Sequence, residues 1–403
     1  MSMQGTGKAR WRICDRAAVW TVVVVVAVSG SALAQSARSD LLGPKLDFMW
    51  GPVLGHAGTT FFTVACRTTR PCAVRLDVGG KTYTSEAGEY HRFRAEGLEP
   101  NTAYAYTMVA QSSEAAEAPR AGPYTVRTLP EEGQLVFVAL GDNRTNPDRW
   151  ARVSSAAAGK KPAFSIHTGD LVKDGRLEFS WGRECFEPAK PFFATVPCYP
   201  VIGNHEENSP VFLRMFVTPS GQKNWAQEIG PLLLIGLDGR MDWRAGSALT
   251  QWLDGVLSAS DAKFIFLASH YPPWSSGKHG IAGDPDVVKA RTVILPLLEK
   301  YRATAMICAD DHFYERSEPP GGVTVIVSGG AGADLRDRVP PDSPQNPHSK
   351  AFAKKHHYCL FHLDGEVCTM HALTPEGQIL DRREWNARRS GPVKAPAREV
   401  PDE

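Results

Sequence analysis

The spacing of apolar positions along the chain changes near residue 130. Before it, short β-rich runs such as 60–65 and 73–78 are separated by turn residues, and no helical period is evident. After it, continuous apolar runs of strand length alternate with stretches of helical period, which is typical of a layered sheet whose strands are buried on both faces. The pattern predicts a small all-β sandwich at 46–129 and an α/β domain at 130–385.

The elements expected in the second region follow one another in strand–helix order. Strands are expected at 134–140, 163–166, 232–237, 264–268 and 304–308, and helices at 148–158, 248–257 and 287–301. Three later runs are typical of antiparallel strands, namely 323–327, 358–363 and 366–372. Beyond residue 385 the chain is polar and contains Pro, so 386–403 is predicted to be a disordered tail.

Tyr104 follows a turn and begins a β run, which is the position of a tyrosine corner, where the hydroxyl bonds back to upstream backbone. The sequence around it, Leu98-Glu99-Pro100-Asn101-Thr102-Ala103-Tyr104, resembles the L-x-P-x-T-x-Y turn of fibronectin type III domains. This resemblance implies that residues 46–129 form a fibronectin type III-like domain.

Residues 1–34 have the pattern of a secretory signal peptide. An apolar run at 17–28 is followed by a small-x-small cleavage pattern at 32–34, and it is preceded by the basic residues Lys8, Arg10, Arg12 and Arg16. The run is shorter than the roughly 18 apolar residues of a membrane span, so cleavage is favoured over an uncleaved anchor. We expect an exported protein, periplasmic or extracellular, with no membrane attachment after cleavage.

Removing the signal peptide deletes four basic residues and one acidic residue, which moves the formal net charge from +1 to −2. A near-neutral chain lacks the clustered Lys and Arg of a nucleic-acid surface, so no nucleic-acid partner is expected. In an oxidising compartment, nearby cysteines are candidates for disulfides, with Cys308 left over as a small buried thiol. The candidate pairs are Cys66 with Cys72, Cys185 with Cys198, and Cys359 with Cys368.

Five predicted strand ends carry residue types that bind metal ions. Ligands of open α/β sheets collect beyond the carboxyl ends of the strands, and a preceding Gly lets the backbone turn sharply there. Each motif alone is more often a turn or a helix cap, but all five in order indicate one common site. The motifs are Gly141-Asp142-Asn143-Arg144, Gly169-Asp170-Leu171-Val172, Gly203-Asn204-His205-Glu206, Ser269-His270-Tyr271 and Ala309-Asp310-Asp311-His312.

The five motifs resemble the signature of the calcineurin-like metallophosphoesterase superfamily, and their combination with a fibronectin-like domain resembles its purple acid phosphatase branch. The resemblance implies a two-sheet α/β core flanked by helices and a pair of divalent metal ions bridged by Asp170. It implies a site one of Asp142, Asp170 and His312, and a site two of Asp170, Asn204, His270 and Asp310.

The implied activity is hydrolysis of a small-molecule phosphate ester by a metal-activated hydroxide. His205 would contact the phosphate or protonate the leaving alkoxide, and Arg144 would pair with phosphate oxygens. An acid phosphatase-like phosphomonoesterase is the leading interpretation. One alternative is a phosphodiesterase acting on nucleotides or lipid headgroups. Another, from a different class, is a non-catalytic binding protein with a degenerate metal site.

Three positions depart from the family pattern. Arg144 stands where the family has a metal-binding His, Lys173 where purple enzymes have their Tyr, and Asp310 where the last motif begins with His. The expected cofactor is therefore one or two divalent ions, from Fe, Mn or Zn, and the carboxylate of Asp310 favours Mn, Fe or Mg relative to a His-rich site.

Two residues near the motifs are given minor roles. His279 is expected to be an exposed loop residue rather than a substrate contact, and Glu206 to support His205. Specificity is expected to lie in loops such as 272–286 and 334–355.

Overall fold

The structure, a computed structural model, describes residues 45–111, 118–280, 284–339 and 346–388. The predicted signal peptide at 1–34 lies outside the described residues. The described residues from Leu46 to Arg388 group into one compact unit. Among the described residues, no helix is both long and apolar enough to cross a membrane.

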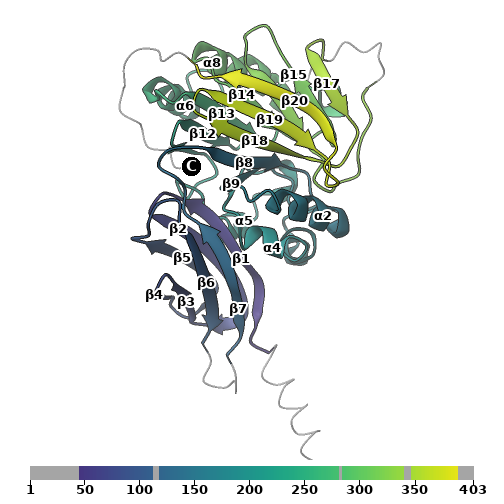
Figure 1. Ribbon diagram of the computed structural model, residues 1–403. Helices are drawn as coiled ribbons and strands as arrows, with labels where there is room; N and C mark the ends of the chain where they lie inside the picture. The colour runs from purple at the N-terminus through teal and green to yellow at the C-terminus, as the bar shows by residue number, and fades with distance from the viewer. Residues whose placement is uncertain (1–44, 112–117, 281–283, 340–345, 389–403) are drawn as a thin grey trace, which may run out of the picture. The chain divides into compact units, whose positions relative to one another are not determined.

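The first region is the predicted all-β sandwich (Figure 1). A three-stranded sheet has the order β1-β2-β5 and a four-stranded sheet the order β4-β3-β6-β7. Tyr104 accepts a hydrogen bond on its hydroxyl from the Glu99 N–H at 2.8 Å, which confirms the tyrosine corner. The strands are β1 (Phe48–Ala57), β2 (Phe61–Cys72), β3 (Val74–Val78), β4 (Lys81–Thr84), β5 (Gly88–Glu96), β6 (Ala103–Ala110) and β7 (Arg120–Arg127).

The second region contains two mixed sheets. The six-stranded sheet has the order β10-β9-β8-β18-β19-β20, and the seven-stranded sheet has the order β11-β12-β13-β14-β16-β15-β17 (Figure 1). The six-stranded sheet comprises β8 (Leu135–Leu140), β9 (Phe164–His167), β10 (Cys198–Pro200), β18 (Tyr358–Asp364), β19 (Val367–Leu373) and β20 (Ile379–Asn386). The seven-stranded sheet comprises β11 (Trp225–Ile229), β12 (Leu232–Leu237), β13 (Phe264–Ser269), β14 (Ala305–Cys308), β15 (Tyr314–Ser317), β16 (Thr324–Ser328) and β17 (Ser349–Ala353).

Aromatic rings fill the space between the two sheets. Phe137 of β8 stacks on Phe361 of β18 with ring centroids 4.6 Å apart. Phe266 of the opposite sheet lies edge-on to both rings, at 5.7 and 5.4 Å. The two sheets therefore share one apolar interior, to which continuous apolar runs such as β8 and β13 contribute.

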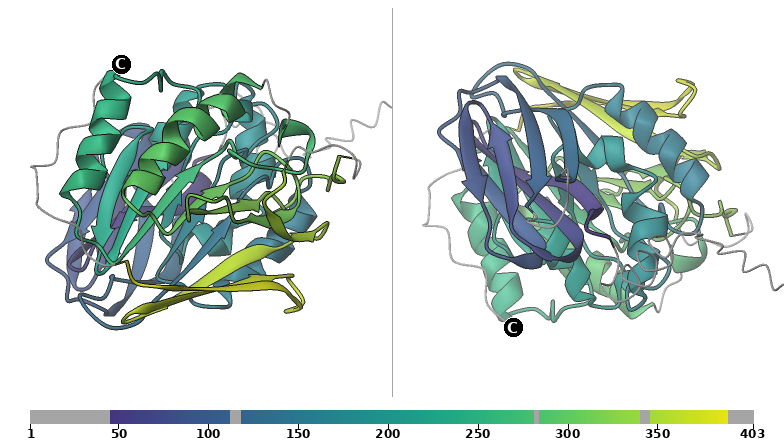
Figure 2. Two further views of the ribbon diagram at one scale, coloured as in Figure 1. Left: turned by 90° about the horizontal axis from the view of Figure 1, so that it is seen from above. Right: turned by 90° about the horizontal axis from the view of Figure 1, so that it is seen from below.

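Helices cover the outer faces of both sheets. Those packed with β8, β10 and β18 are α2 (Pro147–Ala158), α4 (Lys190–Phe193) and α5 (Pro210–Met215). Those packed against the seven-stranded sheet are α6 (Ala248–Ala259) and α8 (Leu295–Lys300). Figure 2 shows these two green helices on one side of the core and the yellow strands on the other. The predicted fold class, a two-sheet α/β core flanked by helices and preceded by a β-sandwich, is confirmed.

One predicted boundary differs in the structure. The helix expected at 287–301 starts at Pro285 and contains a π-helical turn, Ala290–Ile294, between α7 (Pro285–Lys289) and α8. Pro296 lacks the N–H that a regular helix would donate to the carbonyl of Thr292, so the ladder is interrupted there. At the other end, the Arg388 N–H donates to the Lys263 carbonyl at 2.9 Å, and residues 389–403 of the predicted tail lie outside the described residues.

The predicted disulfides are absent from the described part of the chain, where all seven cysteines are buried free thiols. Cys359 on β18 and Cys368 on β19 pair across the sheet with Ala372 and Leu363. Ala372, opposite Cys359, lies four residues from Cys368 along β19, and Leu363, opposite Cys368, lies four residues from Cys359 along β18. Four residues of a strand span about 14 Å. Cys66 with Cys72, and Cys185 with Cys198, are likewise unbonded. Cys308 is the buried thiol expected of it.

Candidate metal centre

Three carboxylates follow the carboxyl ends of parallel strands. Asp142 follows β8, Asp170 follows β9 and Asp310 lies two residues after β14. Their φ angles are 56°, 55° and 69°, in the left-handed region that non-Gly residues seldom adopt. Such backbone costs on the order of 1–3 kcal/mol and gathers at functional sites. The same unusual turn thus recurs at three strand ends that face one centre.

Glycines let these turns approach one another closely. A Cβ added at Gly169, whose φ is 92°, would lie 2.7 Å from the Gly203 nitrogen. A Cβ added at Gly203 would clash with Asp170 Oδ1. The loops after β9 and β10 can therefore touch only because both positions lack a side chain.

Oxygen atoms of the other three residues assigned to site two surround one ring nitrogen of His270. His270 Nε2 lies 3.1 Å from Asn204 Oδ1, 3.4 Å from Asp170 Oδ1 and 3.5 Å from Asp310 Oδ1. The other ring nitrogen, Nδ1, donates to the Thr168 carbonyl at 2.8 Å, which turns Nε2 toward the three oxygens. Burial opposes charge on His270, yet Asp170, Asp310 and Asp142 raise its pKa well above the usual range. A divalent ion bound by these four donors would take the place of the proton that the carboxylates favour on His270.

Buried oxygens without hydrogen bonds support the same conclusion. Asp142 Oδ1 and Asp310 Oδ2 are buried and accept no hydrogen bond among the described residues. Burial raises the pKa of Asp142 well above its usual range, and the charges of Asp170 and Asp310 raise it further. Buried carboxylate oxygens are normally paired or bound to a metal. The donor set of site two, three oxygens and one imidazole, therefore fits a divalent ion.

The residues assigned to site one also meet. Asp142, Asp170 and His312 each offer a ligand atom, and these atoms lie within 4.8 Å of one another. His312 Nδ1 donates to the Asp334 carbonyl at 2.8 Å, so Nε2 faces the site, 3.7 Å from Asp142 Oδ1. Burial, Arg336 and Arg144 lower the pKa of His312 to about 4, so its imidazole is neutral at pH 7.

Arg144 extends its guanidinium between two members of site one. Its Nε donates to Asp170 Oδ2 at 3.0 Å, and its Nη2 donates to His312 Nε2 at 3.3 Å. The side chain is only 11% exposed. A guanidinium has no lone pair for a metal and cannot be deprotonated in a protein. Asp142, Asp170 and His312 could still hold a metal ion, but that ion would have to compete with this guanidinium for Asp170 and His312.

The charges of the centre can be counted for the protonation state in which its ligands bind a metal. With all three carboxylates ionised and His270 neutral, Asp142, Asp170 and Asp310 face the one guanidinium of Arg144, which leaves a net charge of −2. One divalent ion at site two would neutralise that charge.

His205 lies at the open side of the centre. Its Nδ1 donates to the Lys173 carbonyl at 2.6 Å, and its Nε2 lies 3.8 Å from Asp170 Oδ2 with the side chain 30% exposed. Nε2 thus faces Asp170 at the exposed side of the centre.

Glu206 has a different role from the one expected. Its buried carboxylate accepts the N–H groups of Gly203, Asp170 and Leu171 at 2.5, 3.1 and 2.7 Å. It therefore holds the loops after β9 and β10 together, and the support of His205 is indirect. Burial and the charge of Asp170 raise the pKa of Glu206 to about 7.

His279 is closer to the centre than the sequence suggested. Its Nδ1 lies 3.3 Å from Asp310 Oδ2, and its side chain is 23% exposed, so the expectation of an exposed loop residue is wrong. Two buried carboxylates hold this loop: Asp311 accepts the Ser275 hydroxyl at 2.5 Å, and Glu315 accepts the Ser276 N–H at 2.7 Å. Since both contacts are remote in sequence, no local pattern around His279 indicates them.

The region that contains this centre is similar in sequence to known proteins. Residues 135–314 match the model of the calcineurin-like phosphoesterases. Rat tartrate-resistant acid phosphatase type 5 (Rattus norvegicus) is 35% identical over 86 residues, which are 21% of this chain and 25% of that protein. The chain thus aligns with only about a quarter of the length of that relative.

Solved structures show the same fold at low identity. A purple acid phosphatase from yellow lupin (Lupinus luteus) seeds superposes with a TM-score of 0.73 at 16% identity, over 83% of this chain and 74% of that one. PhoD superposes with a TM-score of 0.64 at 16% identity, over 86% of this chain and 94% of that one. The domain at residues 135–314, with its metal-ligand motifs at the strand ends, thus matches the calcineurin-like phosphoesterase family model.

Proposed function

We propose that the protein is a metal-dependent phosphoesterase, acting as an acid phosphatase-like phosphomonoesterase, with one divalent ion held by Asp170, Asn204, His270 and Asp310. The observation that carries the proposal is the convergence of these donors around His270 Nε2. A divalent ion bound there would activate water and polarise a phosphoryl oxygen. The carboxylate-rich donor set favours Mn²⁺ or Fe²⁺, while Zn²⁺ remains an alternative for the test.

Residues of the chain supply the remaining functions. Because Nδ1 of His205 is engaged with the Lys173 carbonyl, its Nε2 is the atom that delivers a proton to the leaving alkoxide. Arg144 uses two N–H groups on Asp170 and His312 and keeps others for phosphate oxygens. His279, beside Asp310, is a second imidazole within the site.

The proposal is tested with the purified protein loaded separately with Mn²⁺, Fe²⁺ and Zn²⁺. Each form is assayed against phosphomonoesters, including p-nitrophenyl phosphate, and against the matching diester, bis-p-nitrophenyl phosphate. Monoester hydrolysis that is lost with a chelator and restored by metal supports the proposal. Faster diester hydrolysis would favour the phosphodiesterase alternative. Metal binding without turnover of any ester would favour a binding protein.

A second expectation concerns colour. Purple enzymes owe their absorption to a tyrosinate bound to ferric iron, and here Lys173 stands at that position with an exposed side chain. We therefore predict a colourless protein after loading with iron in air. The measurement is the visible absorption spectrum of the iron-loaded protein. A charge-transfer band would show that another Tyr binds the metal, and Tyr271, next to His270, would be the first to replace by Phe.

We also propose export, supported by the basic, apolar and small-residue pattern of residues 1–34. N-terminal sequencing of the protein recovered outside the cytoplasm should give a chain that begins near residue 35. Recovery of the full-length chain in the membrane fraction would favour the uncleaved anchor.

A further inference from the structure

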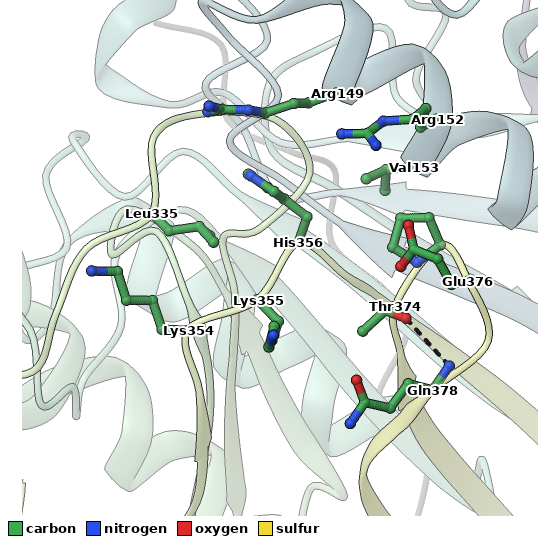
Figure 3. A pocket seen from close by; sticks show the side chains of 11 residues that line it. Arg149, Arg152, Val153, Leu335, Lys354, Lys355, His356, Thr374, Glu376 and Gln378 are labelled. Carbon is green, nitrogen blue, oxygen red and sulfur yellow. Dashed lines mark hydrogen bonds between the residues drawn. The ribbon is translucent and has the colours of Figure 1, made fainter.

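A basic pocket of about 310 Å³ lies apart from the metal centre, and Figure 3 shows the side chains that line it. Its cations come from α2 and from the loop before β18, and the turn between β19 and β20 closes the opposite side. In Figure 3, Arg149 and Arg152 reach from α2 on the side opposite Gln378. The charged and titratable lining residues are Arg149, Arg152, Lys354, Lys355, His356 and Glu376.

The positive charge of this pocket is only partly balanced. Arg149 pairs with Asp334 at 2.6 Å, and Lys354 pairs with Asp337 at 2.7 Å. Both carboxylates are largely exposed, so these pairs contribute little. Within the described part of the chain, Arg152 and Lys355 have no recorded side-chain hydrogen bond or ion pair. A single acidic residue, Glu376, lines the pocket against four Lys and Arg side chains.

The positive charges around the pocket affect the pKa of His356, which also lines it. His356 donates from Nδ1 to the Gly330 carbonyl at 3.1 Å. Burial lowers the pKa of His356, and the charges of Arg149 and Arg152 lower it further. The cations of this region therefore repel additional positive charge, and an anion in the pocket would relieve that repulsion.

The pocket has the form of a binding site rather than of a charged surface. Its floor includes Val153 and Thr374, which are 1% and 5% exposed. Its volume lies at the lower end of the roughly 300–1,000 Å³ typical of small-molecule sites. Gln378 adds an amide at the rim. A planar guanidinium such as that of Arg152 binds phosphate oxygens through two parallel N–H groups.

One short segment separates the pocket from the metal centre. The Asp334 carbonyl accepts from His312 of that centre, whereas the Asp334 carboxylate pairs with Arg149 of the pocket. Leu335, next in the chain, lines the pocket. The two sites therefore lie on opposite sides of one loop and share no side chain.

We propose that this pocket is a second anion site, which binds a phosphate group independently of the metal centre. The ligand is either inorganic phosphate, the product of the proposed reaction, or the phosphate group of a small molecule. The two sources share the same chemistry of recognition. The inference does not require the proposed activity, because it concerns binding alone.

The test is calorimetric titration of metal-free protein with inorganic phosphate at low ionic strength. The pocket variant is Arg152→Glu with Lys355→Glu. The control is Lys160→Glu with Lys190→Glu, which makes the same charge change at two exposed lysines outside the pocket. We expect the control to bind phosphate like the wild type and the pocket variant to bind at least about tenfold more weakly. Circular dichroism checks that all proteins fold.

A third variant, Arg144→Ala, separates the two sites. Phosphate binding that survives Arg144→Ala but is weakened in the pocket variant supports the inference. Binding lost in Arg144→Ala, equal weakening in the lysine control, or no binding by the wild type would each overturn it. Titration with glycerol phosphate distinguishes the sources, since a pocket for phosphorylated molecules binds it as well as free phosphate and a product site binds only the latter.

Discussion

Replacing Asp170 or Asn204 by Ala should abolish phosphoester hydrolysis and leave the fold largely intact. Both side chains contribute an oxygen to the cluster around His270 Nε2, at 3.4 and 3.1 Å. Neither belongs to the apolar core, which is built from the strand interiors. Changes to residues that merely support metal ligands cost about 10–100-fold, so loss of a ligand should lower kcat by more than about 100-fold.

The measurement is kcat and metal content in the same preparations, with thermal unfolding as the check on folding. Asp242→Ala is a matched control, since it removes an exposed carboxylate that pairs with the exposed Arg244. Asp170→Asn is a second variant, because it keeps the hydrogen bond from the His205 N–H and changes only charge. If both Ala variants keep more than about a tenth of the activity, the assignment of site two is wrong.

The sequence predicted the central strands well because they are buried on both faces. The run Leu232–Leu237 is entirely buried, and its limits coincide with those of the predicted strand. β20 was not anticipated, because it is a polar edge strand in which only Trp385 is fully buried. β17, at the edge of the other sheet, has no fully buried residue. The pairing of such strands is decided by remote partners, which local periodicity does not record.

The candidate ligands were identifiable because each follows a strand that must be buried. Parallel strands bring their carboxyl ends to one edge, so motifs far apart in sequence meet there. The direction of individual side chains was not predictable in this way. Arg144 was expected to face a phosphate, and its place between Asp170 and His312 depends on both remote partners. The same holds for His279, whose loop is held by two buried carboxylates, Asp311 and Glu315.

The position of Arg144 links two of the departures from the family pattern, those at positions 144 and 310. In site one, a guanidinium adds positive charge where the family pattern has a neutral imidazole. At site two, Asp310 adds negative charge where that pattern has another imidazole. The total charge of the ligand set is thereby unchanged. The guanidinium of Arg144 and one metal ion, bound by a set of ligands that includes the hard carboxylate of Asp310, would then take the place of two metal ions.

Restoring both family residues, Arg144→His with Asp310→His, should increase the metal content of the protein. The wild type is expected to bind about one equivalent, because only site two has a donor set without a competing cation. In the double variant the guanidinium is removed from between Asp170 and His312, and an imidazole takes its place. The charge changes of the two substitutions cancel. Position 310 has a φ of 69°, which His tolerates better than most residues.

Elemental analysis of dialysed protein measures the stoichiometry, which should rise from about one toward two equivalents. The exposed pair Asp242 and Arg244 provides the control, since Arg244→His with Asp242→His also adds two imidazoles and conserves charge. A rise in metal content in Arg144→His with Asp310→His, but not in the control, supports the interpretation that the Arg144 guanidinium occupies site one. Two full equivalents in the wild type would contradict it. They would mean that Arg144 leaves the site when metal binds, and that a water molecule or another residue completes the shell around Asp142 and His312.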